Sequence, residues 1–205
     1  MANLILHEYA ASGKCYKIRL TAAHLGLALE RREYDIMLGE TRSEDFLTGV
    51  NANGRIPVLQ VGDDFLPESN AACWYLADGS DLIPHDRFDR ADMLRWLFWE
   101  QYNHEPNVAT LRFWHMWIGA DNFTGLQRTL EPVKREAGEA ALTLMDEHLA
   151  QTPFFAGGRF SLADIALYAY THVCETGLYQ LSRYPNVQAW IARVAALPGH
   201  IAIDA

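Results

Sequence analysis

The segment Asn51–Ala72, NANGRIPVLQVGDDFLPESNAA, decides the fold of this 205-residue chain. Its first half is a glycine turn followed by the apolar run Ile56–Val61, which has a proline at its second position. Proline cannot donate to a sheet ladder, so this proline indicates an edge or the start of a strand. The bond Ile56–Pro57 is also a candidate cis peptide. Gly62–Asp64 then predicts a hairpin turn into a short strand at Phe65–Leu66.

The second half of this segment predicts a ligand site. Pro67–Asn70 contains a carboxylate and a hydroxyl, and an apolar helix is expected from Ala71 to Ala77. Polar side chains and free backbone N–H groups therefore meet where a strand passes into a helix N-terminus. Such a position binds charged, amino-acid-like ligands well.

Two strings in the segment, G-R-I-P-V-L and P-E-S, resemble the glutathione-binding half of the cytosolic glutathione transferases. In that family the residue before a cis-proline pairs through its backbone with the cysteinyl part of glutathione, and the Glu-Ser pair holds the γ-glutamyl group. The resemblance covers essentially the whole chain and implies a transferase that uses glutathione as a substrate and needs no metal. It implies a glutathione site made of Arg55, Ile56, Pro57, Glu68 and Ser69.

Composition excludes several other classes. The chain is 50% hydrophobic, which is enough for one large or two small domains with real cores. A net charge of −9 argues against nucleic acid as the main partner. No apolar run reaches the length of a membrane span, and the N-terminus lacks the basic region of a signal peptide. Cys15, Cys73 and Cys174 lie far apart in no metal-type spacing, so we expect a cytoplasmic protein without membrane partners.

Residues 1–78 are expected to form a thioredoxin-like domain, an α/β fold. Four elements are predicted before the hairpin, in the order β-α-β-α: Asn3–Glu8, Cys15–Leu25, Glu33–Met37 and Ser43–Leu47. Ser43 is a plausible N-cap for the last of them. The hairpin and the helix that follows complete the order as β-β-α.

Residues 79–86 are expected to be a linker, and residues 87–205 an all-α domain, as in the transferase architecture. The predicted helices are Phe88–Tyr102, Asn107–Ile118, Glu131–Ala150, Ser161–Cys174 and Asn186–Ala196. We expect a helix break at Pro106 and place Pro132 in the first turn of its helix. Ser161 and Asp164 form a predicted capping box, so Asp164 is interpreted as structural rather than catalytic.

The chemistry is expected in Ser12–Arg19, SGKCYKIR. This stretch resembles the serine-type transferases, including the zeta class and related bacterial enzymes, in which the first serine of a similar string is catalytic; this implies Ser12. Lowering a thiol pKa from about 8.5 to below 7 means a change of roughly 2 pKa units, which requires about 2.7 kcal/mol. A hydroxyl at a helix start combines a charged hydrogen bond of about 1.5–3 kcal/mol with a dipole effect of about 0.3–1 kcal/mol. The alternatives are that Ser12 is a plain N-cap, or that Tyr9 is the donor, as in other transferase classes.

Cys15 opens a second possibility. It lies three residues after Ser12, the spacing of a C-x-x-C redox pair whose first member is replaced. A cysteine near a helix N-terminus beside Lys14 could attack disulfides, which would make the chain a glutathione-dependent disulfide reductase or isomerase. We favour the interpretation that Cys15 lies one turn too deep and is partly buried. A third class is a non-catalytic binding module of the same fold.

Aromatic residues crowd the first two predicted helices of the all-α domain, and most of them are expected in its core. In the family one face of these helices lines the electrophile pocket, which implies Tyr102, Trp114 and Trp117 as candidates. His104 and His115 lack a metal-type spacing and are interpreted as polar histidines rather than ligands. The resemblance further implies a homodimer that covers part of the first of these helices.

Overall fold

The computed structural model describes residues 3–205 as two compact units. The first runs to Ser80 and also includes Pro198–Ala205; the second is Asp81–Leu197. These last residues fall within residues 87–205, the predicted helical domain. They belong to the first unit because side chains of its first helix donate hydrogen bonds to their backbone carbonyls.

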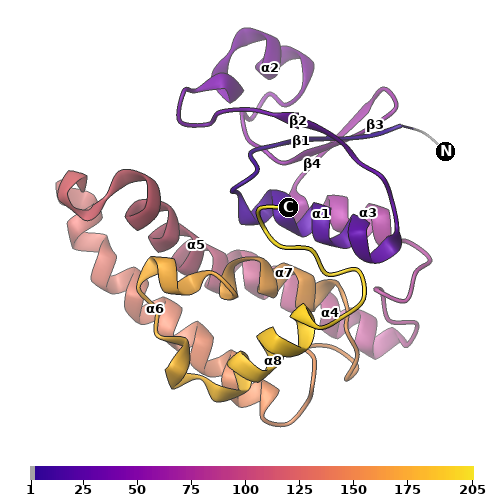
Figure 1. Cartoon of the computed structure of the whole chain (residues 1–205), viewed down its shortest axis with the longest axis vertical. Helices are drawn as coiled ribbons and strands as arrows, with labels where there is room; N and C mark the ends of the chain where they lie inside the picture. Colours follow the sequence, from indigo (N-terminus) through magenta and orange to yellow (C-terminus); the bar gives the residue numbers. More distant parts are fainter. Residues whose placement is uncertain (1–2) are drawn as a thin grey trace. The chain divides into compact units, whose positions relative to one another are not determined.

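The first unit is built on a four-stranded sheet with strand order β2-β1-β3-β4. Its strands are β1 (Leu4–Glu8), β2 (Glu30–Glu33), β3 (Val58–Val61) and β4 (Asp64–Pro67). β1 pairs parallel with β2 and antiparallel with β3, and β3 and β4 form the predicted hairpin. The helices are α1 (Gly13–Leu25), α2 (Glu44–Gly49) and α3 (Ser69–Ala77), with a 3₁₀ turn at Glu40–Arg42. α1 and α3 lie side by side on one face of the sheet, and α2 lies on its other side (Figure 1).

Three local predictions are confirmed in this unit. The bond Ile56–Pro57 is cis. Ser43 caps α2 by accepting a hydrogen bond from the backbone N–H of Phe46 at 3.3 Å. The order of helices and strands is thioredoxin-like, as the sequence indicated.

The predicted strand Glu33–Met37 is wrong, because β2 lies at Glu30–Glu33. All residues of β2 are exposed and charged, so no alternation of apolar residues marks this strand in the sequence. Its parallel pairing with β1 decides its position. The chain turns directly afterwards, where the carboxylate of Asp35 accepts the N–H groups of Met37 and Leu38 at 2.7 and 3.1 Å.

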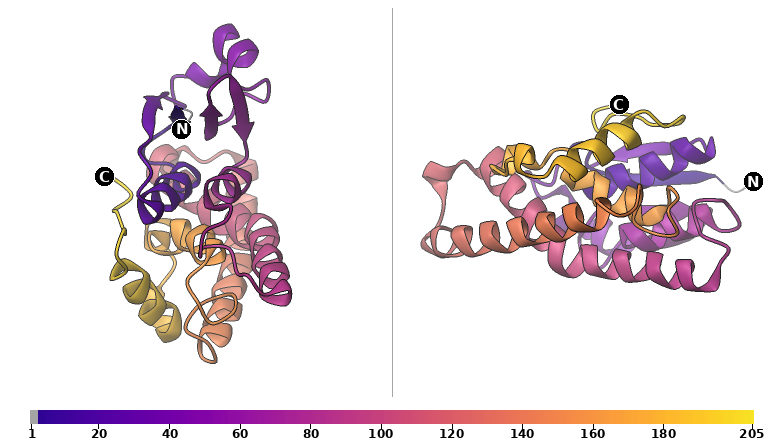
Figure 2. Two further views of the ribbon diagram at one scale, coloured as in Figure 1. Left: turned by 90° about the vertical axis from the view of Figure 1, so that its right-hand side faces the viewer. Right: turned by 90° about the horizontal axis from the view of Figure 1, so that it is seen from below.

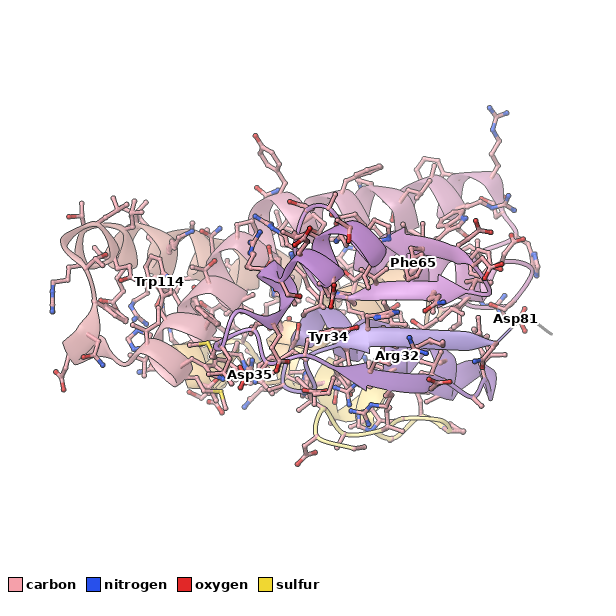
Figure 3. All side chains as sticks on the ribbon, turned by 90° about the horizontal axis from the view of Figure 1, so that it is seen from above. Arg32, Tyr34, Asp35, Phe65, Asp81 and Trp114 are labelled. Carbon is pink, nitrogen blue, oxygen red and sulfur yellow. The ribbon has the colours of Figure 1, made fainter. Side chains whose placement is uncertain are left out.

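One side of the sheet carries a buried polar residue. His7 on β1 is hydrogen-bonded to the Tyr34 hydroxyl at 2.9 Å and to the Gln60 side chain at 3.0 Å. Its ring lies 5.7 Å from the ring of Phe65. Figure 3 looks onto the sheet from above and labels Tyr34 and Phe65. Burial is the main reason that the pKa of His7 lies below its usual value, so the neutral imidazole is favoured.

The second unit is all-helical. Its helical segments are α4 (Arg87–Trp99), a π-helical segment (Glu100–His104), α5 (Glu105–Phe113), a second π-helical segment (Trp114–Ile118), α6 (Gly125–Leu149), α7 (Leu162–Thr171) and α8 (Pro185–Ala195). Short 3₁₀ turns occupy Ala120–Asn122, Cys174–Gly177 and Leu181–Arg183. The long helix α6 packs along α5 (Figure 2).

α7 is the centre of this unit, since all of its residues are buried. The predicted capping box is confirmed: Asp164 accepts from the N–H of Ser161 at 3.0 Å and from its hydroxyl at 3.1 Å. Its other carboxylate oxygen accepts from the Phe155 N–H and the Trp190 indole. Burial raises the pKa of Asp164 to about 7 although these donors oppose the shift. Its structural role is evident from these four bonds.

The helices differ from the prediction at two prolines. There is no break at Pro106, because the chain stays helical from α4 through the π-helical segment into α5. The wider turn accommodates a ring that would clash with the carbonyl four residues earlier in a regular α-helix. α6 starts at Gly125 rather than Glu131, so Pro132 lies inside it. Its start is set by a capping box in which Thr124 and Gln127 exchange hydrogen bonds of 3.2 and 2.9 Å.

Candidate functional site

A hollow in the first unit brings together all five residues that the sequence indicated for glutathione. It is lined by Lys14, Asn51, Asn53, Arg55, Ile56, Pro57, Pro67, Glu68 and Ser69. The additional polar members come from the first turn of α1 and from the turn before β3. Two of them belong to the segment that decides the fold, but nothing in their spacing alone marked them as site residues.

The turn before β3 is fixed by the Asn51 side chain. Its oxygen accepts from the Asn53 N–H at 3.0 Å, and its amide donates to the Arg55 carbonyl at 2.9 Å. Gly54 has a φ of +63°, and a Cβ there would lie 2.6 Å from the Arg42 guanidinium. Glycine is therefore required for the turn that presents Arg55 and the cis peptide to the hollow.

The other side of the hollow combines backbone strain with an unsatisfied hydroxyl. Glu68 has a φ of 73°, one of two positive values for non-glycine residues within 3–205. Such strain costs about 1–3 kcal/mol and concentrates at functional sites. Ser69, which begins α3, is 2% exposed. Its Oγ has no hydrogen-bond partner among the described residues. Because buried polar groups are nearly always hydrogen-bonded, this hydroxyl points to a ligand.

The charges around the hollow have a definite pattern. Lys14 and Arg55 supply two cations, and Glu68 supplies one carboxylate. The side chain of Glu68, the N-cap residue of α3, makes no capping hydrogen bond, and the first N–H groups of a helix have no partner within it. These groups complement a ligand with two carboxylates and one ammonium group.

Ser12 lies two residues before Lys14 and caps α1. Its backbone is extended, and its Oγ accepts from the Cys15 N–H at 3.5 Å. The plain N-cap geometry is therefore present. In this geometry the Ser12 hydroxyl accepts through a lone pair, so its own O–H can still donate a hydrogen bond. Tyr9 precedes it in the same loop, and its carbonyl accepts the Ser12 N–H at 2.9 Å.

Cys15 is fully buried in α1. Burial is the main cause that raises the pKa of its thiol to about 12. A thiolate is the reactive form of cysteine, so this environment disfavours attack on disulfides. The expected burial of Cys15 is confirmed and is complete, but the residue lies in the first turn of α1 and not one turn deeper. Cys73 and Cys174 are likewise buried and free.

The three candidates for the electrophile pocket lie along one helical stretch and have different neighbours. Tyr102 is 85% exposed. It lines a depression of about 280 Å³ with Trp99, Asn103, Asn107, Ala137, Ala140, Ala141 and Leu144. Trp114, which is labelled in Figure 3, lies more than three helical turns further along and packs 5.8 Å from Phe123. Trp117 stacks on Phe113 at 5.6 Å and lies under the Arg112 guanidinium.

The two histidines of this region are polar residues with partners, as interpreted from the sequence. His104 is buried and is hydrogen-bonded to the Thr171 hydroxyl at 3.0 Å. His115 contacts the Glu131 carboxylate at 3.1 Å. Across residues 3–205 no group of three or more histidine, cysteine or acidic side chains is placed to hold a metal ion.

Comparison with known proteins identifies the family. Residues 3–78 match the glutathione S-transferase N-terminal domain, and residues 108–193 match the glutathione S-transferase C-terminal domain. The chain belongs to the glutathione S-transferase family. A crystal structure of a glutathione S-transferase from Pseudomonas fluorescens is 41% identical, with a TM-score of 0.92 and 98% of each chain covered.

Curated relatives of this transferase support the same family. Glutathione S-transferase 2 of Anopheles gambiae is 30% identical, with 92% of this chain and 88% of the relative covered. Human glutathione S-transferase theta-2 is also 30% identical, with 85% and 73% covered. These similarities support glutathione transferase activity and favour neither the disulfide reductase nor the non-catalytic module. No helix that we describe in the transferase has the length and apolarity needed to cross a bilayer.

Proposed function

We propose that this transferase binds glutathione in the hollow between β3, β4 and the start of α3, and activates its thiol at Ser12 for attack on a small electrophile. The observation that carries the proposal is Ser69, a buried hydroxyl without a described partner, next to the strained Glu68. Strain and an unsatisfied polar group together are expected where a ligand completes the structure.

Each charged part of glutathione has a counterpart in the hollow. Glu68 would hold the ammonium group of the γ-glutamyl moiety. Ser69 and the N-terminus of α3 would hold its carboxylate. Ile56, which precedes the cis-proline, would pair through its backbone with the cysteinyl part. Arg55 and Lys14 line the hollow and would face the glycine carboxylate.

Ser12 would donate its O–H to the glutathione sulfur at the N-terminus of α1. The hydrogen bond and the helix dipole favour the thiolate, so the thiol proton passes to solvent at neutral pH. The thiolate sulfur then forms a bond to the electrophilic carbon, and the leaving group departs with its electron pair or the acceptor takes up a proton. Tyr9 remains the alternative donor. The burial of Cys15 argues against a direct role for its sulfur.

We infer a homodimer and a cytoplasmic location for the transferase. Phe98 is 73% exposed and Tyr102 is 85% exposed, and both lie in the continuous helical stretch of α4 and its π-helical segment. Exposed aromatic side chains in one stretch indicate a surface that is covered in the assembly. Free cysteines throughout the described chain suit a reducing compartment. Trp114 and Trp117 are the candidates for the electrophile pocket, with Tyr102 as the third.

Calorimetric titration of glutathione tests the binding site. Removing a carboxylate that meets a buried ammonium group costs about 2–5 kcal/mol, so Glu68→Ala should raise Kd at least about tenfold. Asp63→Ala in the β3–β4 turn is the matched control, since it removes the same charge from the same unit at an exposed position outside the hollow. An unchanged Kd in Glu68→Ala, or an equal rise in both variants, would contradict the assignment.

A further inference from the structure

Arg19 connects four parts of the first unit through one guanidinium group. It lies in α1 and is 3% exposed. Its Nη2 donates to the carbonyls of Ala10 at 2.6 Å and Ile203 at 2.8 Å. Its Nη1 donates to the backbone oxygen of Ala205 at 2.8 Å, and its Nε lies 3.1 Å from a carboxylate oxygen of Glu8. Only arginine offers this planar set of donors.

Glu8 explains why the charge of Arg19 can be buried. It ends β1 and is fully buried. One carboxylate oxygen faces Arg19 and the other accepts from Arg31. Arg31 also donates to the backbone oxygen of Ala205 at 2.9 Å. A buried carboxylate held by two arginines is compensated, so the cluster can act as a fixed anchor.

The anchor acts on the loop that carries Ser12. This loop joins β1 to α1, and Ala10 is its second residue. The Ala10 N–H donates to the Glu33 carboxylate at 2.7 Å, while the Ala10 carbonyl accepts from Arg19 at 2.6 Å. Both backbone polar groups of Ala10 are therefore held by charged side chains. Ser12 follows two residues later.

The segment Pro198–Ala205 completes the anchor from the far end of the sequence. The Tyr16 hydroxyl donates to the Ile201 carbonyl at 2.6 Å, which lays the segment along α1. At Gly199 a Cβ would lie 2.9 Å from the backbone of His24, so the segment approaches the helix closely. It then supplies two of the backbone oxygens that accept hydrogen bonds from Arg19.

We propose that Arg19 is a positioning residue that fixes the Tyr9–Ser12 loop, and that the segment Pro198–Ala205 holds Arg19 in the orientation this requires. The inference rests on the proposed role of Ser12 in holding the glutathione thiolate. A donor that must meet a sulfur anion works only if its position is fixed to a fraction of an ångström. Arg19 does not line the hollow proposed for glutathione, so its effect would pass through the backbone of Ala10.

The experiment uses Arg19→Lys in the full chain. Lysine keeps the charge beside Glu8 but cannot reach the three backbone oxygens together. We expect faster hydrogen exchange at the amides of Ala10 to Gly13. We also expect a rise of about one unit in the pKa of bound glutathione and a fall of about tenfold in kcat at neutral pH. The Kd for glutathione, titrated at a pH below the pKa of the bound thiol, should not change, because the binding groups lie elsewhere.

Arg31→Lys is the matched control, because Arg31 shares Glu8 and Ala205 with Arg19 but does not contact Ala10. The inference is overturned if Arg31→Lys reproduces the whole effect, or if the Arg19 variant keeps the parent loop exchange and thiol pKa. A second variant, Glu33→Ala, removes the carboxylate that accepts the Ala10 N–H and lies at an exposed position. It should also speed amide exchange in the loop and raise the thiol pKa. If neither quantity changes in Glu33→Ala, the inference is overturned. If Ser12→Ala leaves the thiol pKa unchanged, the role of Ser12 fails, while hydrogen exchange still reports whether Arg19 fixes the loop.

Discussion

Replacing Ser12 by alanine separates its role as a helix cap from its proposed role as a donor to the glutathione thiolate. As a helix cap, its Oγ accepts from the Cys15 N–H at 3.5 Å, which is long for a hydrogen bond. Loss of this cap should therefore cost about 0.5 kcal/mol of unfolding free energy, the low end for such residues. In its proposed role as a donor to the thiolate, it would contribute about 1.5–3 kcal/mol. Since one pKa unit is about 1.4 kcal/mol, the pKa of bound glutathione should rise by roughly 1–2 units.

The ultraviolet absorbance of the thiolate, titrated against pH with glutathione bound, measures this pKa directly. Conjugation at neutral pH should fall by about ten- to a hundredfold and should recover at higher pH, where the thiol ionises without help. Ser43→Ala is the control, because it removes the cap of α2, a 3.3 Å bond to the Phe46 N–H, without touching the hollow. If Ser12→Ala changes stability as Ser43→Ala does and leaves the thiol titration in place, Ser12 is only a helix cap.

Three further outcomes are expected. Cys15→Ala should leave conjugation nearly intact, and loss of a measured disulfide reductase activity in that variant would support the redox alternative instead. Light scattering should give twice the chain mass of 23.2 kDa. The substitution Tyr102→Glu should shift the protein toward the monomer. A parent protein that is monomeric at micromolar concentration would exclude the dimer. Because the pKa of His7 is lowered in the folded protein, His7 takes up a proton at higher pH in the unfolded chain than in the folded one. The contribution of His7 to stability is therefore present above about pH 6.5 and is lost as the pH falls below that value. Thermal unfolding of His7→Gln should show a weaker loss of stability between neutral and acidic pH than the parent protein; an identical pH dependence would exclude this contribution.

Local rules made much of the fold predictable. Pro57 after an apolar residue marked a strand start with a cis peptide, and the structure has both. The Ser161–Asp164 spacing predicted a cap, and the structure confirms it. Such features depend on a few neighbouring residues, whose backbone preferences and hydrogen bonds are nearly independent of the rest of the chain.

The sequence also identified most of the candidate site, because its residues lie in two short segments. Arg55 to Pro57 and Glu68 to Ser69 flank one hairpin, and antiparallel pairing returns the second segment to the first. Lys14 was not linked to them, since it comes from a helix far away in sequence. The unsatisfied hydroxyl of Ser69 depends on which groups surround it, and only the packed structure shows that.

Tertiary structure alone decided the features that join distant parts of the chain. β2 has no apolar signal and is a strand because β1 offers it a parallel partner. The segment Pro198–Ala205 has no helical or strand pattern, and its place is set by donors on α1 that satisfy its backbone carbonyls. A buried carbonyl must find a donor somewhere, but the sequence does not say which one. The sequence by itself therefore determined most of the elements and the glutathione motif, whereas the packing of distant side chains determined the place of β2 and how the Ser12 loop is held.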